Sequence, residues 1–167
     1  MPFDRGGVVA FAFGTPSTIL PNQRIAEKAL KIAQEHNALV YTQADIELPE
    51  NLVNVTYTEE TAGDPPPTLR IARGAAAWAA KHNLNTLYVV CASPHEWRCK
   101  RDLSTAVKER GLDVQVILPF LGETDRESLS WFSPDSTQPR TTSLEAWRKR
   151  ERILEWMPLW LYKRVAS

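Results

Sequence analysis

The chain has 167 residues, of which 43% are hydrophobic and 24% are charged, and this composition is typical of one globular domain rather than a disordered segment. Twenty basic residues balance 20 acidic ones, so the chain lacks the positive excess of a general nucleic-acid binder. No stretch approaches the roughly 18 apolar residues of a membrane-spanning helix, and the N-terminal segment has no signal-peptide pattern. We therefore expect a cytoplasmic protein with no transmembrane anchor and no nucleic-acid partner.

The chain contains two cysteines, Cys91 and Cys99, which form neither a CxxC motif nor a zinc-ligand pattern. We interpret both as buried free thiols, which fits a reducing compartment. The glutamates between residues 47 and 60 have no ligand spacing and are interpreted as part of a solvated loop. No metal site is predicted.

Strand-like and helix-like segments alternate along the first 118 residues. Short apolar runs predict strands buried on both faces, and apolar residues at i, i+3, i+4 spacing predict helices. In chain order the predicted elements are strand 7–13, helix 22–35, strand 38–42, a plausible strand 52–56, helix 69–82, strand 87–92, helix 94–110 and strand 114–118. This order predicts a three-layer, Rossmann-like α/β sandwich with a mainly parallel sheet and helices on both faces.

Glycine, threonine and arginine residues follow the predicted strands. Gly14 and Thr15 come after the first strand, and Gly14 either lets a ligand approach the backbone or is an ordinary turn glycine, since one glycine is no dinucleotide fingerprint. Arg24, in the first turn of the next helix, is unfavourable for the helix dipole, so it is either solvated or faces an anion. Thr68 is the predicted cap of the following helix, where Arg70 is placed in the same unfavourable way.

The segment LYVVCASPHEWRCKR runs from a buried strand directly into a helix. Ser93 suits the N-cap, Pro94 the first turn and Glu96 the third position of a capping box. Capping explains neither His95 nor Arg98. Because ligands in open α/β sheets bind at the carboxyl ends of strands, these two side chains are the leading candidates for a ligand site.

The last part of the chain is a long connection at residues 119–142 and a helix at residues 143–164, which Pro158 is expected to kink or break. A connection of this length is usually functional or mobile, so a lid over the site and a partner contact through residues 120–142 are both open. We expect the helix to dock on the core or to form a homodimer contact, with a membrane-surface helix as the alternative. We treat residues 1–167 as a single domain.

Four pieces of this pattern resemble the YdcF/SanA/ElyC-like domain, a family of largely unknown function found mostly in bacteria. They are a first strand ending in glycine (VVAFAFGTP), an arginine at the start of the first helix (NQRIAEKAL), a threonine opening a helix after an acidic stretch (EETAGDPPPTLRIA), and a strand followed by His95 and Arg98 (VVCASPHEWR). The resemblance covers about residues 8–118 and implies a Rossmann-like fold. One member has been linked to S-adenosylmethionine and others to envelope maintenance; many carry a membrane anchor, which we do not expect here.

The chain departs from the family pattern in three places. A single glycine, Gly14, stands for the usual glycine run after the first strand, and QAD at residues 43–45 replaces the glycines after the second strand. The family's T-x-E-N-A pattern becomes TLRIA at residues 68–72, without the acid and the amide. These departures imply an altered pocket.

Three alternative functions are consistent with these residues. The first is binding of a small anionic or nucleotide-like ligand, with S-adenosylmethionine or a nucleotide as the cofactor that the resemblance implies. The second is a hydrolase or transferase acting on a phosphorylated substrate with His95 as acid/base, and the third is a structural or dimerisation module without a ligand. The candidate ligand-binding residues are Gly14, Thr15, Arg24, Thr68, Arg70, Ser93, His95 and Arg98.

Overall fold

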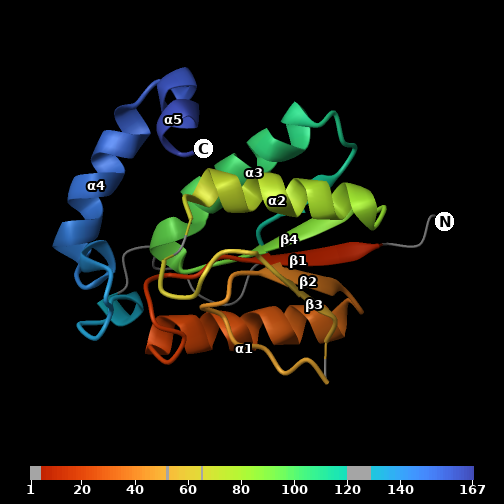
Figure 1. The fold of residues 1–167 in the computed structure, drawn as a ribbon, viewed down its shortest axis with the longest axis horizontal. Helices are drawn as coiled ribbons and strands as arrows, with labels where there is room; N and C mark the ends of the chain where they lie inside the picture. The colour runs from red at the N-terminus through yellow and green to blue at the C-terminus, as the bar shows by residue number, and fades with distance from the viewer. Residues whose placement is uncertain (1–4, 52, 65, 120–128) are drawn as a thin grey trace.

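The computed structural model describes residues 5–51, 53–64, 66–119 and 129–167 and confirms the predicted α/β sandwich (Figure 1). Within these residues, parallel strands form one sheet in the order β3-β2-β1-β4-β5. The strands are β1 Gly6–Ala10, β2 Leu39–Thr42, β3 Val55–Tyr57, β4 Thr86–Val90 and β5 Gln115–Ile117, and the helices beside them are α1 Leu20–Glu35, α2 Thr68–Lys81 and α3 Glu96–Glu109. The chain builds outward from β1 to β3 and then returns to add β4 and β5 on the other side of β1, as in Rossmann-like folds.

The sheet lies between two helical layers, with α1 on one face and α2 and α3 on the other (Figure 1). Every residue of β1 and β4 is buried, because these two central strands are covered on both faces. They pair in parallel register from Gly6 opposite Thr86 to Ala10 opposite Val90. The segments that follow them therefore begin side by side at one edge of the sheet.

Both predicted helix caps are wrong. Helix α2 starts at Thr68 itself, with Pro67 at the N-cap position and no side-chain cap there. A 3-10 turn at Ser93–His95 precedes α3, so His95 and not Ser93 holds the N-cap position of that helix. Pro94 is compatible with the tighter turn, so the α-helix begins two residues later than predicted, and His95 is buried.

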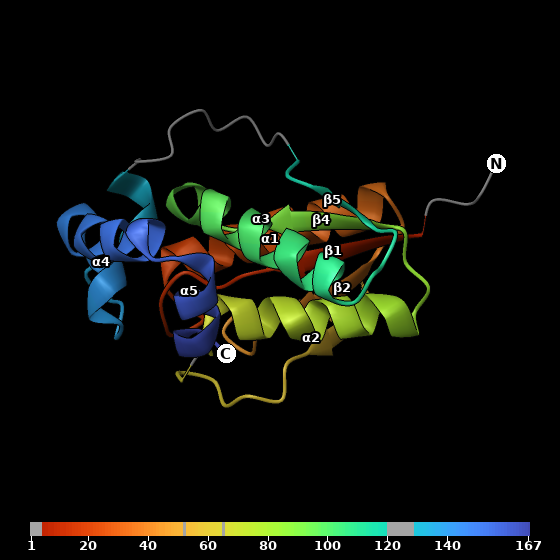
Figure 2. The ribbon, with the colours of Figure 1, turned by 90° about the horizontal axis from the view of Figure 1, so that it is seen from above.

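Residues 129–167 form a C-terminal arm that lies beyond the carboxyl ends of the strands (Figure 2). The arm contains α4 Leu144–Trp156 and α5 Leu159–Val165, and the break between them at Met157 and Pro158 confirms the expected effect of the proline.

The arm docks on the body through three aromatic side chains. Trp131 is fully buried against α1, Trp147 packs beside Phe13, and Tyr162 packs on Leu69 of α2. Trp147 and Tyr162 lie in the predicted last helix, and their burial confirms that it docks on the core. The lid and the partner contact predicted for residues 120–142 stay predictions, because residues 120–128 lie outside the described residues. Within the described part of this connection, Trp131 is buried in the chain itself.

Cys91 and Cys99 are buried free thiols, as predicted. In the part of the chain that the structure describes, no helix combines the length and the hydropathy needed to cross a bilayer. The same part contains no group of three or more His, Cys, Asp or Glu side chains that could hold a metal ion.

Trp131→Ala should lower the free energy of unfolding by about 3–5 kcal/mol, because it leaves a cavity at a fully buried aromatic site. Trp160→Ala is the matched control, since the same change at a side chain that is 63% exposed should alter stability by no more than about 0.5 kcal/mol. Urea denaturation followed by circular dichroism measures both. Equally small effects would show that this part of the arm does not dock on α1.

Candidate functional site

The candidate site lies at the carboxyl ends of β1 and β4. The connections that follow these adjacent strands run to opposite faces of the sheet, which is the position where open α/β sheets bind ligands. A cavity of about 40 Å³ occupies this position, between the sheet and the C-terminal arm. The polar and charged side chains that line it are Gln43, Thr68, His95, Arg98, Gln138, Arg140, Thr141 and Arg150.

The cavity volume limits what can bind. One water molecule needs about 10–15 Å³ of such space, whereas pockets for drug-sized ligands start near 300 Å³. A volume of about 40 Å³ therefore admits a few water molecules or one small oxyanion. A whole nucleotide or S-adenosylmethionine does not fit in this cavity.

The loop after β1 is shaped by contact with the arm. Asn22 of α1 donates to the Gly14 carbonyl at 3.0 Å, and Gly14 has a φ of +89°, a conformation that favours glycine. A Cβ at Gly14 would lie 2.6 Å from the hydroxyl oxygen of Thr141, so the close approach of the arm explains this glycine. Thr15 is buried and its N–H donates to Ser136 at 3.3 Å, which directs Thr15 to the arm and away from the cavity.

His95 connects the turn after β4 to α2 and α3. Its Nε2 lies 3.0 Å from Nη2 of Arg98 and 3.2 Å from the Thr68 hydroxyl. Because a guanidinium group can only donate, Nε2 accepts and the imidazole proton sits on Nδ1. Nδ1 is buried and has no hydrogen-bond partner among the described residues. The Thr68 hydroxyl, predicted to cap α2, serves this contact instead.

The His95 imidazole is neutral at physiological pH. Burial is the main reason that its pKa lies well below the usual value, and the positive charges of Arg98, Arg140 and Arg150 add to the effect. The hydrogen bonds of His95 to described residues involve Thr68 and Arg98, and no described carboxylate orients the ring. The arrangement therefore favours a positioning role for His95 over acid/base chemistry.

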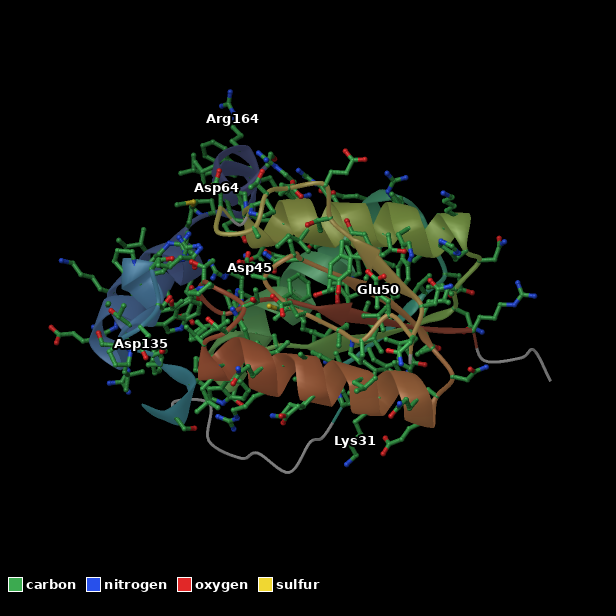
Figure 3. All side chains as sticks on the ribbon, turned by 60° about the horizontal axis from the view of Figure 1, so that its bottom comes forward. Lys31, Asp45, Glu50, Asp64, Asp135 and Arg164 are labelled. Carbon is green, nitrogen blue, oxygen red and sulfur yellow. The ribbon has the colours of Figure 1, made fainter. Side chains whose placement is uncertain are left out.

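Three arginines converge on the cavity from three elements. Arg98 of α3 is 4% exposed, lies 3.1 Å from Oε1 of Glu151 on α4, and its guanidinium is 5.3 Å from the centre of the Trp147 ring. Arg140 lies in the 3-10 turn Pro139–Thr141 and Arg150 lies on α4. By contrast, Lys31 and Arg164 extend outward from the body in Figure 3.

Arg140 and Arg150 are half-buried, and neither has a hydrogen bond or an ion pair to a described residue. Burial, followed by the charges of Arg140 and Arg98, lowers the pKa of Arg150 to about 10. Burial and the charge of Arg98 also lower the pKa of Arg140. Both side chains remain cationic at neutral pH, so the cavity wall carries partly desolvated positive charges that repel one another.

The structure brings together four of the predicted ligand-binding residues, Gly14, Thr68, His95 and Arg98. Ser93, also predicted, does not line this cavity and instead lines a separate groove between α3 and α4.

Two other predicted ligand-binding residues, Arg24 and Arg70, do not line the cavity. The Arg24 guanidinium lies 4.0 Å from the centre of the Trp131 ring and donates to the Ser130 hydroxyl at 3.1 Å. Arg70 is exposed and donates to the backbone carbonyl of Ser167 at 3.1 Å. Arg70 also lies 4.0 Å from the Glu60 carboxylate. Arginines at helix starts need a compensating partner, and here the protein itself supplies one for each.

Sequence reasoning missed Arg140 and Arg150. A signal existed for Arg150, which shares the inner face of α4 with Trp147, Glu151 and Leu154 at i, i+3, i+4 and i+7 spacing. Charged residues on an otherwise apolar helix face indicate a buried polar site. Arg140 follows a proline in an irregular segment, and no local pattern marks it.

No protein-family model matches the chain, and no curated protein matches it either.

The neutral state of His95 predicts a pH-dependent stability. Because the folded protein lowers the His95 pKa, the unfolded chain binds this proton first, and stability is lost as pH falls below about 6.5. The free energy of unfolding of the wild type minus that of His95→Gln should therefore decrease between about pH 7 and pH 5. His82→Gln, at an exposed histidine, should keep the wild-type profile. Urea denaturation across this pH range measures the difference, and a constant difference would contradict a neutral His95.

Proposed function

We propose that the protein binds a small anionic ligand in the cavity at the carboxyl ends of β1 and β4. One observation carries this proposal: three arginines line the cavity, and no described carboxylate does. Removing guanidinium groups from water without a counter-charge is costly, and a bound anion would offset that cost. Arginine also recognises phosphate and carboxylate groups through two parallel hydrogen bonds.

The backbone adds to the attraction for an anion. Helix α2 is 14 residues long and its first residue, Thr68, lines the cavity, so the positive end of its dipole faces the same space. Together with the arginines, this arrangement supports anion binding at the position where the resemblance also implies a ligand.

The other two functions have less support. A hydrolase or transferase with His95 as acid/base would need a free imidazole nitrogen facing the substrate, whereas Nε2 accepts from Arg98 and Nδ1 is buried. A purely structural module would leave Arg140 and Arg150 half-buried with no direct hydrogen bond or ion pair among the described residues, and the charge of Glu151 would be shared among three arginines.

Membership of the YdcF/SanA/ElyC-like family is likewise a proposal. Gly14, Thr68, His95 and Arg98 occupy the positions that carry the resemblance, and they meet at one cavity. Arg24 occupies the remaining position but packs on Trp131. On this proposal, the family's site would be retained in part and completed by arginines of the arm.

Calorimetric titration with inorganic phosphate tests the anion site, with chloride at equal ionic strength as the background. Phosphate should bind, and Arg150→Gln should weaken binding by about tenfold to a hundredfold, since a hydrogen bond to a charged group contributes about 1.5–3 kcal/mol. Arg152→Gln is the matched control, because it removes the same charge from an exposed position on the same helix. Equal losses in both variants, or no binding to the wild type, would refute the proposal.

A further inference from the structure

We infer that the ligand is a dianion of the phosphate-monoester type, which includes inorganic phosphate, and not a monoanion such as a carboxylate or a phosphodiester. This inference rests on the proposed anion site and specifies its ligand. It follows from three features: the number of positive charges at the cavity, the acidic side chains that compensate them, and the volume of the cavity.

The positive charges exceed their nearby compensation by two. Arg98, Arg140 and Arg150 contribute three, and His95 contributes none because it is neutral. Glu151 lies 3.1 Å from Arg98 and compensates one of them from the side away from the cavity, where it lines the groove between α3 and α4. If Glu151 were protonated and therefore uncharged, the excess of positive charge at the cavity would increase.

The next acidic group near Arg98 does not change this count. Asp102 of α3 is buried, but it pairs with Arg101 at 2.8 Å and accepts a hydrogen bond from the Tyr162 hydroxyl. Its charge is therefore already compensated within the contact between α3 and α5. The two positive charges without a partner are those of Arg140 and Arg150.

A dianion matches this arrangement better than a monoanion. Arg140 and Arg150 come from different elements, and each guanidinium presents a fork of donors that fits two oxygens. A tetrahedral phosphate group has enough oxygens for both forks, whereas a carboxylate has two oxygens and one charge. The cavity of about 40 Å³ fits one such group, so its charge must be carried by a single small anion.

Calorimetric titration of the full chain with four probes separates the classes. Methyl phosphate and sulfate are the dianions, and dimethyl phosphate and methanesulfonate are the monoanions of comparable shape. At about pH 7.5 we expect the dianions to bind at least tenfold more tightly, because each meets one more uncompensated charge in a partly desolvated site.

A pH series distinguishes titration of the ligand from titration of the protein. The second pKa of a phosphate monoester is about 6, so methyl phosphate should lose roughly tenfold in affinity between about pH 7.5 and pH 5 as it becomes a monoanion. Sulfate does not titrate in this range and should lose much less. Parallel losses for the two would assign the effect to the protein and overturn the inference.

Charge-removing variants supply the second test. Arg140→Gln removes one unpaired charge and should reduce the ratio of dianion to monoanion affinity by at least about threefold, whereas Arg152→Gln should preserve the ratio. Arg150→Gln repeats the test on α4 if Arg140→Gln does not fold. If monoanions bind the wild type as tightly as dianions, the dianion inference fails while the anion site stands. If none of the four probes binds, the proposed function itself fails.

Discussion

The Arg98 guanidinium group is the contact on which the arrangement of the site depends. It lies within 3.0 Å of His95 in the turn after β4 and within 3.1 Å of Glu151 on α4, and it faces the Trp147 ring. One buried side chain therefore joins the α/β body, the C-terminal arm and the cavity. Removing either charge of a buried pair leaves the other uncompensated, at a cost of about 3–5 kcal/mol. The arm is thus held at the carboxyl ends of the strands by electrostatics as well as by packing.

The arm changes what a Rossmann-like crevice can accept. In this topology the carboxyl ends of the central strands are usually open to a ligand that extends across them. Here the approach of Thr141 to Gly14 and the packing of Trp147 beside Phe13 fill most of that space. The remaining volume is about 40 Å³, and its chemistry is set by arginines from the arm as much as by the body. The fold supplies the position of the cavity, and the arm limits its volume and contributes Arg140 and Arg150 to its wall.

Charge is balanced over the whole chain but not at the cavity. Twenty basic and 20 acidic residues give no net charge, yet Arg98, Arg140 and Arg150 meet where no described carboxylate lines the wall. The net charge of a chain affects binding to extended partners such as nucleic acids, because these contact a large part of the protein surface. It does not bear on a site of a few atoms, where the field depends on which side chains are closest.

The sequence by itself determined the order of strands and helices, the break at Pro158 and the prominence of His95 and Arg98. These features depend on local patterns: apolar periodicity, the fixed φ of proline, and the polar residues that directly follow a buried strand. Only the tertiary structure decided which arginines meet at the cavity. Arg24 and Arg70 were predicted to bind a ligand because they lie at helix starts, but both contact the arm. Arg140 and Arg150 line the cavity instead. The physical reason is that the place of the arm is set by long-range packing of its aromatic side chains, which no local periodicity encodes.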